Sequence, residues 1–158
     1  VLGPQEAFLV LRGLKTLPIR MEKHCANARA VAEFLAASPQ VERVYYPGLA
    51  QDAFYPIAKR QMKDFGAMIA FEVRGGKEAG MQFVNALHLC TIAVSLGDAE
   101  TLIEHPASMT HAAYGLEELK QAGIAEGLVR LSVGLEDEQD LLADLAQGLE
   151  TLEKKGGR

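Results

Sequence analysis

An arginine lies in the middle of a segment that otherwise predicts a buried β-strand. In GLVRLSVGLED, residues 127–137, alternate side chains of a strand point to opposite faces. One face then carries Val129, Leu131, Val133 and Leu135. The other face carries Leu128, Arg130, Ser132 and Gly134. A guanidinium on a strand can hold a carboxylate through two parallel hydrogen bonds, or it can rest its stem on apolar surface and reach water. The segment alone leaves both roles of Arg130 open.

A second candidate for chemistry is the segment AVSLGDAETLIEHPASMTH, residues 93–111. Ser95 ends an apolar run and is followed by Leu96 and Gly97, so its hydroxyl and the next backbone N–H groups could face a site. Further on, HPASMTH combines two histidines, a serine and a threonine without helical periodicity. Irregular polar segments of this kind often carry binding residues. The pattern alone nevertheless favours a structured surface loop with capping hydroxyls.

The spacing of these residues argues against several kinds of site. His105 and His111 are six positions apart, which fits no zinc-ligand spacing, and no cysteine accompanies them. Ser95, Asp98 and His111 could formally make a hydrolase triad, but the G-x-S-x-G turn that presents such a serine is missing. The Gly75-Gly76 pair belongs to no phosphate-binding glycine pattern. We therefore predict neither a metal site nor a nucleotide-phosphate site.

Strand and helix patterns alternate along the chain and predict a layered fold with a small sheet covered by helices. Pro4 should open a first helix, and Pro18 should kink or break it before a second long helix that ends at Ser38. Strand patterns are present at 41–46, 67–73 and 128–133, with a less regular fourth at 90–95. Helical patterns are present at 53–62, 77–87, 116–121 and 138–152.

Composition narrows the class of protein. The chain has 158 residues, 49% of them hydrophobic, which suits one globular domain. A net charge of −5 with few basic clusters argues against nucleic-acid binding. No apolar run reaches membrane-spanning length. Cys25 and Cys90 are far apart and are expected to be reduced core residues of a cytoplasmic protein, and the tail 153–158 is expected to fray.

Four stretches carry a resemblance to a known family: LRGLKTLPIRMEKHCANA, YYPGL, AVSLGDAETLIEHPASMTH and GIAEGLVRLSVGLEDEQDLLADL. In these stretches the chain resembles the C-terminal domain of the pyridoxal-phosphate enzymes of cysteine and methionine metabolism, the cystathionine γ-synthase and γ-lyase family. The motifs are long, and together they cover essentially the whole chain. The resemblance implies a fold-type I enzyme, a cytoplasmic homotetramer whose large domain binds pyridoxal 5'-phosphate.

The resemblance also implies the fold and domain role of this chain. It would be an α/β (α+β layered) domain with a small, mainly antiparallel sheet covered by helices. Residues 1–158 would form the C-terminal substrate-side domain of a larger enzyme. Residues 1–38 would be long helices that link it to a missing N-terminal cofactor domain.

The family's substrate site maps onto residues already singled out. In the family the arginine of LVRLSVG binds the substrate α-carboxylate, which implies that role for Arg130. The serine of SLG assists it, which implies Ser95, with the backbone of Leu96 nearby. Thr110, in MTH, is a weaker candidate for the same wall of the site.

One position separates relatives within the family. Cystathionine γ-lyases tend to carry an acidic residue just before the serine of SLG, and this chain has Val94 there. An apolar wall leaves the distal amino group of cystathionine unpaired but suits a short thioether. Val94 therefore favours methionine or homocysteine as substrate, and O-acylhomoserine sulfhydrylases of the same family remain an alternative.

The family's cofactor lysine has no counterpart here. It lies in a Ser-x-x-Lys segment of the large domain, and no such segment occurs in this chain; Lys15 matches a structural stretch instead. We therefore expect a fragment of a carbon–sulfur lyase that carries the carboxylate clamp, contains no catalytic residue and is inactive alone. A non-catalytic domain that binds a partner is the second hypothesis.

Overall fold

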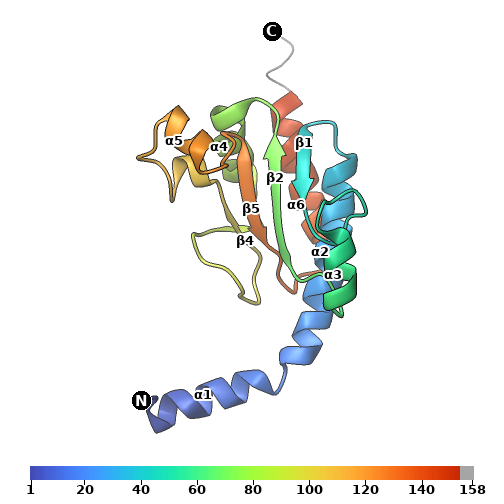
Figure 1. Cartoon of the computed structure of the whole chain (residues 1–158), viewed down its shortest axis with the longest axis vertical. Coiled ribbons are helices and arrows are strands. Elements are labelled where there is room, and N and C mark those ends of the chain that lie inside the picture. Colours follow the sequence, from blue (N-terminus) through green and yellow to red (C-terminus); the bar gives the residue numbers. More distant parts are fainter. Residues whose placement is uncertain (154–158) are drawn as a thin grey trace.

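The computed structural model describes residues 1–153 and contains one five-stranded sheet in the order β1-β2-β5-β4-β3 (Figure 1). The strands, in that order, are Val41–Tyr45, Met68–Val73, Leu128–Ser132, Leu102–Glu104 and Thr91–Ile92. Neighbouring strands are antiparallel except β3 and β4, which are parallel. The prediction of a small, mainly antiparallel sheet is confirmed.

The helices follow the predicted periodicity closely. They are α1 (Pro4–Leu14), α2 (Leu17–Ala37), α3 (Tyr55–Gln61), α4 (Gly76–Ala86), α5 (Leu116–Gln121) and α6 (Glu138–Glu153), with a short 3-10 helix, η1, at Pro106–Ser108. The helix is interrupted between α1 and α2, as predicted. Pro18 lies in the first turn of α2, where its missing N–H costs little. The expected fraying of the tail concerns residues 154–158, which lie outside the described residues.

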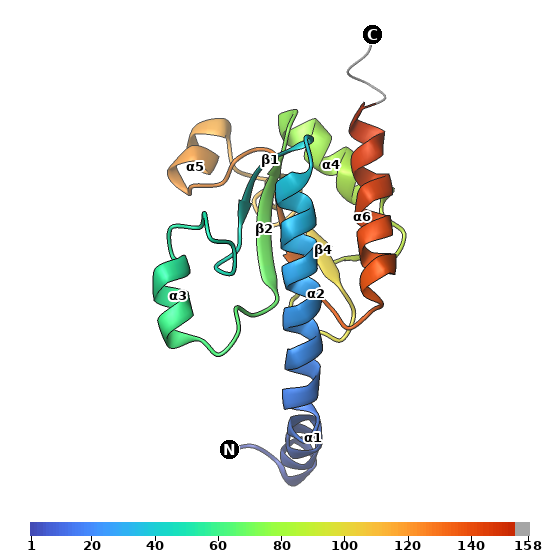
Figure 2. The same ribbon diagram turned by 90° about the vertical axis from the view of Figure 1, so that its right-hand side faces the viewer.

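The hydrophobic core lies between one face of the sheet and three helices. Val129, Leu131 and Val133, which the alternation in β5 placed on one face, are each at most 1% exposed. They pack with Ile69 and Phe71 of β2 in the same cluster as buried residues of α2, α4 and α6, which lie together on one side of the sheet (Figure 2). Each such side chain contributes about 1.5–3 kcal/mol by leaving water.

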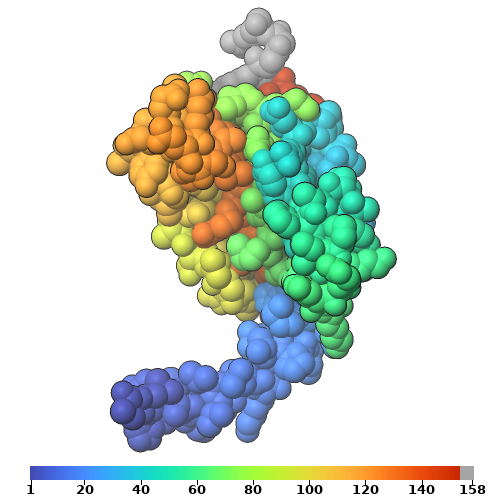
Figure 3. Space-filling view, in the orientation of Figure 1, coloured from blue at the N-terminus to red at the C-terminus, as the bar shows by residue number. Residues whose placement is uncertain are grey.

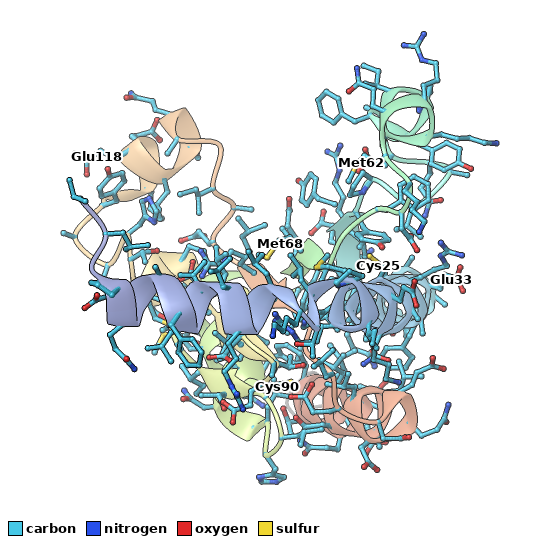
Figure 4. The ribbon with its side chains drawn as sticks, turned by 90° about the horizontal axis from the view of Figure 1, so that it is seen from below. Cys25, Glu33, Met62, Met68, Cys90 and Glu118 are labelled. Atoms are coloured by element: carbon cyan, nitrogen blue, oxygen red, sulfur yellow. The ribbon has the colours of Figure 1, made fainter. Side chains whose placement is uncertain are left out.

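The opposite face of the sheet is only partly covered. Helices α3 and α5 lie on this side, towards different ends of the sheet (Figure 2). Seen from below, Met62 beside α3 and Glu118 of α5 rise on either side of Met68, the first residue of β2 (Figure 4). Between them, segments with the colours of β2 and β5 reach the molecular surface (Figure 3). Arg130 belongs to this open face.

One strand was missed by the sequence analysis and another is shorter than expected. β4 lies inside the polar segment 93–111, where three consecutive residues, Leu102, Ile103 and Glu104, are all buried. A three-residue strand shows no alternation, and its pairing partners β5 and β3 are distant or irregular in sequence. The fourth predicted strand, 90–95, is reduced to Thr91–Ile92, and the chain after Ala93 forms a loop.

Helix α1 extends away from the rest of the molecule and contains no buried residue (Figure 1). Its exposed side chains include Phe8, Leu9, Val10 and Leu11. Over residues 1–153 we find no helix with the length and apolarity needed to span a membrane. Cys25 and Cys90 are free and buried, as expected, and burial raises the pKa of both thiols.

Candidate functional site

Arg130 lies in β5, the middle strand of the sheet, and faces the open side. In the register of the sheet it is opposite Ala70 of β2 and Glu104 of β4. The methyl group of Ala70 leaves space beside the arginine, and the Arg130 side chain is 28% exposed. The strand alternation that buries Leu131 therefore presents the guanidinium to the surface between α3 and α5.

Two segments hold the guanidinium of Arg130. Its Nη1 lies 3.0 Å from Oε1 of Glu104, whose side chain is only 4% exposed. Its Nη2 donates a hydrogen bond of 2.9 Å to the backbone carbonyl of Ser95. The guanidinium is thus pinned by a buried carboxylate and a loop carbonyl and does not simply extend into water. It keeps further N–H donors that these two contacts do not use.

The loop that supplies the Ser95 carbonyl is itself tied to β5. The N–H of Gly97 donates a 2.9 Å hydrogen bond to Oγ of Ser132, which is 2% exposed. Gly97 has a φ of 83°, a left-handed conformation that favours glycine. Ser132, predicted on the same face as Arg130, therefore acts inside the structure by fixing residues 95–97 beside the arginine.

The structure brings some of the predicted site residues together. Ser95 contacts Arg130, but through its carbonyl oxygen, while its side chain is exposed. Val94 and Leu96, on the same loop, expose 59% and 57% of their surface. Thr110 is exposed and shares a 3.0 Å hydrogen bond with Nδ1 of His111. Within residues 1–153 no hydrogen bond connects Thr110 with Arg130.

Both histidines of the segment HPASMTH contact neighbouring groups of the fold. His105 is 1% exposed, and its ring nitrogens lie 2.7 Å from the carbonyl oxygen of Glu126 and 2.8 Å from Oγ of Ser108. Burial lowers the pKa of His105 and favours its neutral form. The ring of His111 meets that of Tyr114 edge-on. In residues 1–153 no group of three or more His, Cys, Asp or Glu could hold a metal ion.

Glu104 is the site residue that sequence reasoning missed. No local pattern marks it, because its neighbours Leu102 and Ile103 are buried too and β4 is very short. Its partner Arg130 becomes visible only once the sheet places β4 beside β5. An acidic residue in a short apolar segment is the only available signal, and it is a weak one.

The lysines of residues 1–153 bear on the pyridoxal phosphate that the resemblance implies. Its carbonyl forms a Schiff base with a lysine in an enclosed site. Within residues 1–153 every lysine is exposed except Lys77, which is half-buried. Lys15 follows the last residue of α1 in solvent. The residues described here therefore do not fit the cofactor, although they include a basic group suited to a carboxylate.

Comparison with known proteins gives a consistent result. A family model described as Cys/Met metabolism PLP-dependent enzyme matches residues 1–150. An L-methionine gamma-lyase of Fusobacterium nucleatum is 64% identical over 152 residues, 96% of this chain and 38% of that enzyme. The enzyme of the same name from Treponema denticola is 63% identical over 153 residues, 97% of this chain and 38% of its own length.

A solved structure gives the same fold. The crystal structure of cystathionine gamma synthase from Xanthomonas oryzae pv. oryzae, in complex with aminoacrylate and cysteine, matches 96% of this chain and 39% of its own, with a TM-score of 0.88 and 51% identity. The chain thus spans about 38% of the length of the curated relatives described here.

Proposed function

Because this chain belongs to the Cys/Met metabolism PLP-dependent enzyme family, we propose that it is the C-terminal, substrate-side part of an L-methionine γ-lyase. The whole enzyme would convert L-methionine and water into methanethiol, 2-oxobutyrate and ammonia by α,γ-elimination. The observation that carries this proposal is the 64% identity to an L-methionine gamma-lyase, compared with 51% to a cystathionine gamma synthase.

In this enzyme Arg130 would bind the α-carboxylate of the substrate. A guanidinium on an open sheet face, held on two sides and with N–H donors to spare, suits a carboxylate. Ser95 and Leu96 would form the adjoining wall, with Thr110 a weaker contributor. Val94 would face the thioether end of the substrate, where an apolar side chain accepts methionine or homocysteine better than cystathionine.

The cofactor and assembly follow from the same proposal. Pyridoxal phosphate supplies the electron sink of such enzymes, and its lysine would belong to an N-terminal domain outside this chain. Residues 1–158 would form the substrate-side domain, with residues 1–38 linking it to that cofactor domain. The whole enzyme would be a cytoplasmic homotetramer, and this chain alone would be inactive.

Substitution of Arg130 tests the proposed site. In the full-length enzyme, Arg130→Ala should lower kcat/KM for L-methionine by about 10²-fold or more, because the substrate is no longer oriented. Methanethiol release gives the rate. Arg29→Ala is the matched control, since Arg29 pairs with Asp64 at the surface and its side chain is 52% exposed. An unchanged kcat/KM for Arg130→Ala would refute the assignment of Arg130.

Substrate preference separates methionine cleavage from the other activities of the family. We expect kcat/KM of the wild-type enzyme to be higher for L-methionine and homocysteine than for cystathionine. O-acylhomoserine with sulfide tests the sulfhydrylase activity. A higher value for cystathionine or O-acylhomoserine would replace the methionine assignment while leaving the carboxylate site intact.

A non-catalytic, partner-binding chain is the second candidate, and the exposed apolar residues of α1 favour it. Phe8, Leu9 and Leu11 are each more than half exposed, and apolar surface of this kind marks contact sites. In analytical ultracentrifugation the isolated chain should then self-associate, and Leu9→Glu with Leu11→Glu should reduce the association. A monomer that binds no ligand would exclude this candidate.

A further inference from the structure

We propose that Glu104 is the positioning residue for Arg130, and that it sets the orientation in which the guanidinium receives the substrate carboxylate. The inference rests on the proposed role of Arg130 and concerns how that role is achieved. Glu104 itself would not touch the substrate, because it is buried beneath the open face.

The Glu104 carboxylate is buried on strand β4. Its side chain is 4% exposed, Oε1 faces Nη1 of Arg130, and within the described residues Oε2 has no hydrogen-bond partner. A buried carboxylate with an unsatisfied oxygen loses much of its hydration, and an apolar residue of similar size in its place is often neutral or stabilising. Packing alone therefore does not account for an acid at this position of β4.

The pairing of two strands sets the position of Glu104 relative to Arg130. Glu104 lies directly opposite Arg130 in the antiparallel pair of β4 and β5, and Ile103 lies opposite Leu131 in the core. The carboxylate thus stands on a rigid strand, whereas the Ser95 carbonyl that holds Nη2 stands on a loop. Arginine side chains have several freely rotating bonds, so a support on a strand restricts the guanidinium most.

The opposite charges of Glu104 and Arg130 lead to a distinctive expectation. Glu104 compensates the positive charge of Arg130 at 3.0 Å. Without Arg130, the acid would be left as an unpaired negative charge beside the incoming substrate carboxylate, which it would repel. Removing Glu104 should therefore harm an enzyme that has Arg130 and help one that lacks it. Because loss of either partner also leaves a lone buried charge, stability alone predicts a reversal in the free energy of unfolding, but none in kcat/KM measured per folded holoenzyme.

The control comes from the same face of the sheet. Glu72 of β2 lies opposite Leu128, two positions from Ala70, the neighbour of Arg130. Its carboxylate accepts a hydrogen bond from the Tyr45 hydroxyl instead of pairing with an arginine. Glu72→Leu thus makes the same chemical change on the same face without disturbing the support of Arg130.

The test compares kcat and KM for L-methionine in the full-length holoenzyme. We expect Glu104→Leu to lower kcat/KM about 10²-fold, mainly through a higher KM, because a displaced guanidinium binds the substrate carboxylate less tightly. Glu104→Gln keeps an acceptor for Nη1 and should recover part of the loss. Glu72→Leu should stay within about 2-fold of the wild type.

The double variant decides between positioning and an independent role. If Glu104 acts through Arg130, Arg130→Ala with Glu104→Leu should have a kcat/KM at least as high as Arg130→Ala alone. This comparison also holds if Glu104→Leu alone fails to fold, because the double variant buries no lone charge. A further 10-fold fall in the double variant, or wild-type kcat/KM in Glu104→Leu, would overturn the inference. A normal kcat/KM in Arg130→Ala would instead refute the proposed function of Arg130.

Discussion

Two buried carboxylates of this chain differ in how their oxygen atoms are satisfied. Asp144 of α6 accepts hydrogen bonds of 2.8, 3.0 and 3.1 Å from the N–H groups of His88, Leu89 and Cys90. It holds the connection between α4 and β3 against the last helix. Among residues 1–153, in contrast, Glu104 has one partner and one unsatisfied oxygen. The first arrangement is that of a structural residue, and the second is the one we relate to function.

Asp144 gives a pH-dependent prediction. Burial alone would raise the pKa of Asp144, but the three backbone N–H groups and Gln147 outweigh it and hold the pKa below its ordinary value of 3.8. A lowered pKa in the folded state stabilises the protein above the unfolded value and loses this effect as pH falls through the folded value. Asp144→Asn should therefore lower the free energy of unfolding by about 1–3 kcal/mol at pH 7.

Urea unfolding at a series of pH values measures this effect. The difference between wild type and Asp144→Asn should be constant between about pH 7 and pH 5 and should shrink below about pH 4. Asp140→Asn is a suitable control, because Asp140 is an exposed acid of the same helix. A difference that grows on acidification would contradict the assigned direction of the pKa shift.

At the scale of elements, features set by local interactions could be predicted from the sequence, and features set by pairing between distant residues could not. Helix α5 and the strands β1, β2 and β5 have local periodicity, so their positions were predicted to within a residue or two. The face of β5 that carries Arg130 and Ser132 was predicted for the same reason. Glu104 and the Ser95 carbonyl could not be predicted as partners of Arg130. Ser95 is 35 positions from Arg130, and β4 is defined as a strand only by its pairing with neighbouring strands.

Helix α4 gives a prediction about packing between elements. Gly80 is buried, and a Cβ added there would fall on the ring of His105, which is fixed by hydrogen bonds to Glu126 and Ser108. Gly80→Ala should therefore destabilise the protein by about 1–3 kcal/mol through overpacking, more than the helix gains from alanine. Thermal and urea unfolding measure the change.

Gly13 of α1 is the matched helical control for Gly80. A Cβ at Gly13 would meet nothing within 4 Å. Because α1 has no buried residue, Gly13→Ala should leave the main unfolding transition unchanged and slightly raise the helical signal in circular dichroism. Equal effects of the two substitutions would show that the contact with His105 does not limit the size of residue 80.

At the scale of the whole molecule, the core is well packed, but one face of the sheet and the apolar residues of α1 are exposed. The sheet is filled on the side of α2, α4 and α6, whereas the open face and the apolar side chains of α1 reach solvent (Figure 4). The Arg130 site lies on that open face. Both features agree with the proposal that a cofactor domain covers them in the whole enzyme.

Titration of the isolated chain with pyridoxal phosphate tests the proposal that the cofactor binds to a separate domain. After borohydride reduction, intact-mass analysis should show no stoichiometric adduct at a single lysine, because the lysines of residues 1–153 are exposed or half-buried. A chain acetylated on its lysines provides the background. One lysine modified in every molecule would place the cofactor site in this chain and refute the assigned domain role.

Alternate side chains of strand β5 belong to the core and to the candidate site. Val129 and Leu131 fill the core, while Arg130 and Ser132, the residues between and after them, build the candidate site. Deleting or inserting a single residue within β5 would exchange the two faces, placing the guanidinium in the core and aliphatic side chains in the site. Changes in chain length within this strand should therefore abolish folding and substrate binding together, whereas substitutions can alter either one separately.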